Sequence, residues 1–151
     1  KYEPETKGVL VAYASIHGNT AEVANKFAEI LRSKGAEKVV VCDLSRTDMS
    51  DAVEDAFRYS HLVVAAASYD GDVFPVMHDF LHHLAIKNYT KRRIGIIENG
   101  SWAPSAGRAM RAIIDTFKGV TVAESMVTIM SSLKDSDIPA LERLADEVLA
   151  E

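Results

Sequence analysis

Short apolar runs alternate with amphipathic segments along the whole chain. The runs are rich in Val, Ile and Ala and predict five buried strands, at 8–14, 38–42, 62–67, 94–97 and 120–129. Between and after them, apolar residues recur at helical spacing. This spacing predicts five helices, at 20–31, 48–57, from Pro75 through Leu84, 106–117 and 138–148. Such alternation predicts a doubly wound α/β domain, with a parallel sheet covered by helices on both faces.

Capping residues support these boundaries. Gly35 follows the first helix and is expected to end it, while Asp48 or Ser50 is expected to be the N-cap of the second. Pro75 is suited to the first turn of the third helix.

Length and composition fit one domain. We assign residues 8–151 of the 151-residue chain to this domain and residues 1–7 to a polar linker or tail. The first segment contains Pro4 and no initiator Met, as expected for a domain cut from a longer chain. A net charge of -5 argues against nucleic-acid binding, and no apolar run approaches the ~20 residues of a membrane span. Cys42 is the only cysteine, which favours a cytoplasmic protein.

The candidate chemistry lies after strands one, three and four, because open α/β sheets bind ligands at the carboxyl ends of their strands. The first segment contains Ser15, Ile16, His17, Gly18, Asn19 and Thr20 and leads directly into a helix. Its hydroxyls, amide and glycine suit an anion nest at a helix N-terminus. It is neither a P-loop nor a dinucleotide fingerprint. The nest contains no Lys or Arg, so backbone N–H groups and the helix dipole are expected to neutralise the anion.

Two further segments carry aromatic residues. Ser68, Tyr69, Asp70, Gly71 and Asp72 follow the third strand, and Asn99, Gly100, Ser101 and Trp102 follow the fourth. Taken alone, each of the three segments also fits an ordinary turn or capped loop. Together they place an anion nest and two aromatic rings at one edge of a sheet. That combination favours a phosphorylated ligand with a flat aromatic ring.

Other reactive residues are interpreted structurally. His78 and His82 are four residues apart on the third helix, but the apolar residues around them take its buried face, so we expect exposed histidines and no metal site. Cys42 is expected to be buried and inert. We find no catalytic general base or nucleophile. A phosphorylation receiver domain would need acidic residues at the ends of strands one and three, and these are absent.

Three motifs carry a family resemblance: YASIHGNTAEVA at 13–24, ASYDGDVFP at 67–75 and NGSW at 99–102. With them the chain resembles flavodoxins over essentially its whole length. It is most similar to the C-terminal flavodoxin-like domain of flavodiiron proteins, also called A-type flavoproteins. Its fourth-strand segment departs from the Gly-Ser-Tyr-Gly-Trp that is usual in that branch.

The resemblance implies a five-stranded parallel sheet in the order 2-1-3-4-5 and flavin mononucleotide (FMN) as cofactor. It implies that 15–20 hold the phosphate, and that 68–72 and 99–102 surround the isoalloxazine ring. The implied function is electron transfer within a flavodiiron-type O₂ or NO reductase. A redox protein or reductase would be the donor, and a di-iron domain of the parent chain or a neighbouring subunit the acceptor. A free-standing short-chain flavodoxin and a flavin-dependent quinone or NAD(P)H oxidoreductase are the alternatives.

Overall fold

A parallel sheet of five strands forms the centre of the molecule. The computed structural model describes residues 3–15, 18–67, 74–100 and 105–150. The strands are β1 (Thr6–Ala14), β2 (Val39–Asp43), β3 (Tyr59–Ala67), β4 (Arg93–Gly100) and β5 (Thr121–Met130). All neighbouring strands pair in parallel, in the order β2-β1-β3-β4-β5. The predicted fold class and strand order are therefore confirmed.

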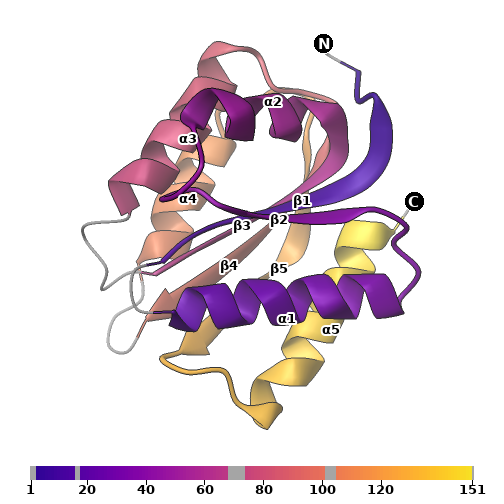
Figure 1. Cartoon of the computed structure of the whole chain (residues 1–151), viewed down its shortest axis with the longest axis vertical. Helices are drawn as coiled ribbons and strands as arrows, with labels where there is room; N and C mark the ends of the chain where they lie inside the picture. The colour runs from indigo at the N-terminus through magenta and orange to yellow at the C-terminus, as the bar shows by residue number, and fades with distance from the viewer. Residues whose placement is uncertain (1–2, 16–17, 68–73, 101–104, 151) are drawn as a thin grey trace.

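In the described part of the chain, five α-helices cover the two faces of this sheet. They are α1 (Asn19–Ser33), α2 (Met49–Arg58), α3 (Phe74–Ile86), α4 (Ala106–Ile114) and α5 (Ile138–Leu149), and a short 3-10 turn, Asp135–Asp137, precedes α5. Figure 1 shows α1 and α5 on one face and α2, α3 and α4 on the other. None of the described helices is long and apolar enough to cross a membrane.

Each face has its own hydrophobic core, because alternate residues of a strand point to opposite sides. In β1, Leu10 joins the core beneath α2, α3 and α4, while Val9 and Val11 join the core beneath α1 and α5. Both cores draw on continuous apolar strands, as the sequence pattern predicts. The sheet is thus buried on both sides and forms a rigid base for the segments at its edges.

Helix boundaries follow the predicted capping residues. The Asp48 side chain accepts a hydrogen bond from the Ser50 backbone N–H and is the N-cap of α2. Gly35 follows α1 with φ +102°, a left-handed conformation that glycine adopts without strain. Helix α4 ends at Ile114, three residues before the predicted end. Phe117 is nonetheless buried, with the centre of its ring 5.9 Å from that of Tyr89. The apolar pattern therefore predicted a buried residue correctly but placed it inside the helix.

The strands β1, β3 and β4 are longer than their apolar runs. β1 begins at Thr6 and β3 at Tyr59, and these two residues pair with each other. At the carboxyl ends of the strands, Asn99 and Gly100 belong to β4 and pair with Ile129 and Met130 of β5. The sequence pattern placed both residues in the following loop. Polar residues and glycine at strand ends carry no apolar signal, but ladder pairing still orders them.

The edge strand β5 contains an irregularity that Glu147 of α5 fills. Ile94 and Ile96 of β4 lie opposite Val122 and Met126, so β5 has extra residues between these pairs. The Glu147 carboxylate accepts hydrogen bonds from the Ser125 backbone N–H at 2.7 Å and from the Ser125 hydroxyl at 2.6 Å. These bonds lower the pKa of Glu147 below its usual value of 4.5.

A depressed pKa makes this contact a source of stability that acid removes. The contribution is present above the unfolded-state pKa, near 4.5, and is lost as the pH falls through the lower folded-state value. We therefore expect Glu147→Gln to be less stable than the parent at pH 7, with the difference shrinking below pH 4.5. Urea unfolding at several pH values measures this, and a difference independent of pH would contradict it.

Candidate functional site

The carboxyl ends of β1, β3 and β4 lie side by side at one edge of the sheet. Ala14 pairs with Ala66, and Ala66 with Glu98. Six of the predicted site residues are described at this edge: Ser15, Gly18, Asn19, Thr20, Asn99 and Gly100. The other nine lie outside the described residues: Ile16, His17, Ser68, Tyr69, Asp70, Gly71, Asp72, Ser101 and Trp102.

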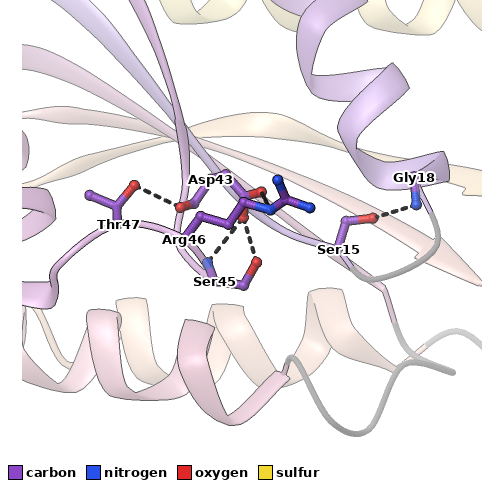
Figure 2. Close-up of polar contacts among 6 residues, drawn as sticks. All are labelled: Ser15, Gly18, Asp43, Ser45, Arg46 and Thr47. Atoms are coloured by element: carbon purple, nitrogen blue, oxygen red, sulfur yellow. Dashed lines mark hydrogen bonds and ion pairs between the residues drawn. The ribbon is translucent and has the colours of Figure 1, made fainter.

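The turn from β1 into α1 has the backbone of an anion-binding helix start. Gly18 is the N-cap of α1, with φ 92° and ψ -18°, and as a glycine it has no side chain to cap the helix. The Gly18 N–H donates to the Ser15 hydroxyl at 3.1 Å, which closes the turn (Figure 2). Thr20 is buried in the first turn of the helix. Gly18, and not Asn19 or Thr20, therefore holds the N-cap position of α1.

First-turn amides of a helix have no acceptor within the helix and point out from its end. In α1 they point toward the edge where β1 ends, and the positive end of the helix dipole lies there as well. This geometry suits the oxygen atoms of a phosphate or carboxylate.

At the same edge, the side chain of Asn99 carries a buried oxygen that accepts no hydrogen bond from the described residues. Its Nδ2 donates to the Ser131 carbonyl at 2.7 Å, which fixes the amide orientation, and its Oδ1 is buried with no hydrogen-bond partner in the described part of the chain. A buried acceptor without a donor costs ~1–3 kcal/mol. Such an orphaned oxygen is common where a bound group completes the network.

The turn after β2 adds residues that the sequence pattern did not single out. The Asp43 carboxylate accepts from the Ser45 N–H at 3.0 Å and from its hydroxyl at 2.7 Å, and Thr47 donates to the Asp43 carbonyl at 2.8 Å. Arg46 lies 3.7 Å from the Asp43 carboxylate with its side chain 86% exposed. Figure 2 shows this turn in one close-up with Ser15 and Gly18.

A topological signal could have found this turn. β2 pairs in parallel with β1, with Tyr13 opposite Asp43, and the Leu44 N–H donates to the Tyr13 carbonyl at 2.8 Å. The carboxyl end of β2 therefore lies at the same edge as the turn from β1 into α1. The sequence analysis considered only the segments after strands one, three and four. For this reason Arg46, which lies in this turn, was not among the predicted site residues.

Burial alters the ionisation of two groups near this edge. It raises the pKa of the Tyr13 hydroxyl, and the charge of Asp43 adds to the effect, so Tyr13 stays neutral at physiological pH. Burial also raises the pKa of the Cys42 thiol, as expected for an unreactive cysteine. Neither group has the lowered pKa of a nucleophile.

Two surface cavities lie away from this edge. One, of about 310 Å³, is lined by residues at the amino ends of the strands, including Gly8 and His61. The other, of about 850 Å³, runs along α2 and the end of α3, past Val53, Phe57 and Lys87. Neither contains the helix start or the orphaned acceptor, so we place the candidate site at the carboxyl edge.

Comparison with known proteins identifies the family of the chain. The family model described as Flavodoxin matches residues 11–133. No curated protein sequence matches the chain. Among solved structures, the flavodoxin of Streptococcus pneumonia TIGR4 is 28% identical, with a TM-score of 0.78, and the match covers 94% of this chain and 97% of that one. A short-chain flavodoxin associated with a non-canonical PDU bacterial microcompartment is 26% identical, with a TM-score of 0.76 and coverage of 95% and 97%.

A larger protein also contains this fold. Rubredoxin oxygen:oxidoreductase from Desulfovibrio gigas is 15% identical, with a TM-score of 0.88. The match covers 97% of this chain but 36% of that protein, so it concerns the shared fold alone. Because the family match spans most of the sequence, the chain belongs to the flavodoxin family, whose members bind FMN and transfer electrons.

Proposed function

We propose that residues 15–20 hold the phosphate of FMN. The observation that carries this proposal is the start of α1, where a glycine in the left-handed conformation, Gly18, holds the N-cap position directly after β1. A phosphate at this position would accept hydrogen bonds from first-turn amides and interact favourably with the helix dipole. The turn after β2 contains a basic side chain, Arg46, whose charge is paired with the Asp43 carboxylate at 3.7 Å (Figure 2).

The flavin ring would lie between the segments that follow β3 and β4. We assign 68–72 and 99–102 to it, and FMN supplies the transfer of one or two electrons when bound. The unpaired Oδ1 of Asn99 supports a polar group of the ligand at this edge. The residues present thus fit a phosphorylated flavin.

For the parent protein, we propose a flavodiiron-type O₂ or NO reductase in the cytoplasm. The 67–75 motif, which resembles the flavodiiron branch, supports this assignment. A redox protein or reductase would donate electrons, and a di-iron domain would accept them. A free-standing flavodoxin is the second candidate, supported by the 28% identity to the pneumococcal flavodoxin across both chains.

The phosphate assignment predicts strong discrimination between FMN and riboflavin. Two charge-assisted hydrogen bonds to the phosphate, at ~1.5 kcal/mol each, correspond to a Kd about 100-fold lower for FMN. Titration of the apoprotein with each flavin, followed by quenching of flavin fluorescence, measures both constants. Equal affinities would refute the assignment of 15–20 to the phosphate.

The parent protein can be tested directly. We expect the native polypeptide, isolated with its flanking sequence, to contain a di-iron domain and to reduce O₂ or NO rapidly, whereas the chain studied alone reacts with O₂ slowly. A native polypeptide with no second domain and no iron would favour the free flavodoxin and remove the flavodiiron assignment.

A further inference from the structure

Two histidines lie one turn apart on the solvent side of α3. The opposite side of this helix packs into the core with fully buried apolar residues: Met77, Phe80, Leu81 and Leu84. His78 and His82 are both exposed, as the sequence pattern predicts. The buried side fixes the helix on the sheet, so the backbone positions of the two histidines are fixed as well.

The two imidazole rings lie almost parallel on successive turns. Their centres are 6.2 Å apart and their planes differ by only 15°. Neither ring makes a hydrogen bond or an ion pair with any residue that the structure describes. The ring nitrogens of both histidines therefore remain available to a ligand from solution.

The next histidine on the same helix is bound differently. Nδ1 of His83 lies 2.7 Å from the backbone carbonyl of Asp79. Since a carbonyl only accepts, Nδ1 of His83 donates this bond, and the ring is held against its own helix. His83 is next to His82 in sequence but about 100° further round the helix, so it lies outside the parallel pair.

Two imidazoles four residues apart on a helix are a spacing that binds transition-metal ions, because both side chains leave the same face. The Cβ atoms of such a pair are about 5–6 Å apart. A tetrahedral ion with metal–nitrogen bonds of about 2.1 Å holds its two nitrogens about 3.4 Å from each other. Exposed rings with centres 6.2 Å apart reach this separation by turning about their own side-chain bonds, without movement of the helix.

The ligand set indicates which ions suit the pair. Among the described residues, no group of three or more His, Cys, Asp or Glu is placed to hold a metal ion, so water would complete the coordination of an ion bound here. Imidazole favours Cu²⁺, Ni²⁺ and Zn²⁺, whereas Mg²⁺ and Ca²⁺ prefer oxygen ligands. With two protein ligands of one kind, the intrinsic order of affinities places Cu²⁺ above Ni²⁺ and Zn²⁺. The exposed Asp79, next to His78, adds a negative charge that attracts a cation.

We propose that His78 and His82 form a surface site for a divalent transition-metal ion and bind Cu²⁺ most tightly. The sequence pattern predicts no metal at these residues; two parallel rings without polar partners are the observation that leads to a different conclusion. The site is independent of the proposed function, because neither histidine belongs to the segments assigned to FMN.

Calorimetric titration of the whole chain, prepared without a histidine tag, tests the proposal with the chlorides of Cu²⁺, Ni²⁺, Zn²⁺ and Mg²⁺. We expect one Cu²⁺ to bind tightly per chain, Ni²⁺ and Zn²⁺ to bind with a higher Kd, and Mg²⁺ not to bind. The folded helix holds the two rings together, whereas the unfolded chain does not. Saturating Ni²⁺ should therefore raise the Tm of the parent.

Three variants assign the binding to the pair. His78→Ala and His82→Ala should each raise the Kd for Cu²⁺ at least tenfold and abolish the rise in Tm, because the second imidazole of a chelate acts at an effective concentration of about 1 mM or more. His83→Ala removes a histidine from the same helix outside the pair and is the matched control. Its Kd should stay within about threefold of that of the parent.

Urea unfolding without metal checks that the variants fold; if an alanine variant does not, His78→Gln or His82→Gln replaces it and keeps a polar side chain. An unchanged Kd in the His78 and His82 variants, or an equal loss in His83→Ala, would overturn the proposal. Fewer bound ions at an unchanged Kd would show separate histidines and would also overturn it. A chain that binds Cu²⁺ with these variant effects but binds no FMN would contradict the proposed function and leave this inference standing.

Discussion

Replacing Arg92 with Leu is expected to lower the free energy of unfolding by about 3 kcal/mol. Arg92 is 3% exposed and donates to the carbonyls of Phe57, Tyr59 and Thr90, the last at 2.8 Å. Its guanidinium carbon lies 5.0 Å from the centre of the Tyr89 ring. Removal leaves three acceptors without this donor, at ~1–3 kcal/mol for each that stays unsatisfied, and removes the cation–π contact.

Thermal and urea unfolding measure this loss. For a domain of this size, about 3 kcal/mol corresponds to a fall in Tm of about 10 °C. Arg92→Lys should be intermediate, because an ammonium group keeps the charge but cannot direct the guanidinium's planar set of donors to three carbonyls. A Leu variant as stable as the parent would show that water or rearrangement satisfies these carbonyls.

Gly18→Val is expected to raise the Kd for FMN about 30-fold. Valine in a left-handed conformation is strained by ~2 kcal/mol, and Gly18 has φ 92°. The free chain can relieve the strain by leaving this conformation, whereas the proposed phosphate contacts require it. Riboflavin binding should change much less, since riboflavin has no phosphate to hold.

Gly35→Val is the matched control at the other end of α1. Gly35 has φ +102°, and at both glycines an added Cβ would meet nothing within 4 Å, so the two substitutions impose similar backbone strain. We expect both variants to lose stability in urea unfolding and only Gly18→Val to lose FMN affinity. Equal FMN affinities in the two variants would show that the start of α1 does not bind the phosphate.

The sequence pattern predicts the centre of the sheet well because most residues of β1, β3 and β4 are buried at consecutive positions, on both faces. A strand between two cores must be apolar at consecutive positions, as β1 is from Val9 to Ala12, and such runs stand out from amphipathic helices. Strand ends are different. Asn99 and Gly100 are ordered by pairing with β5, and pairing partners distant in sequence leave no local trace.

The same distinction separates the predicted from the unpredicted parts of the site. The turn at Gly18 is local, because a strand, a glycine and a helix start follow one another within a few residues. The hydrogen bonds of Glu98, next to the site, were not predicted, since they join it to Gly107 and Thr128, which only the folded chain brings to it. Arg46 was not predicted because its loop was not considered part of the site.

The contact between Glu147 and Ser125 also affects how the chain meets other copies of itself. β5 is an edge strand, and edge strands expose backbone groups that can pair with a strand of another molecule. Here the irregular pairing interrupts the ladder, and the Glu147 carboxylate already occupies the Ser125 N–H. An incoming strand would meet an irregular strand with one backbone N–H already bonded, and such irregularities make an edge strand a poorer template for β-sheet aggregation.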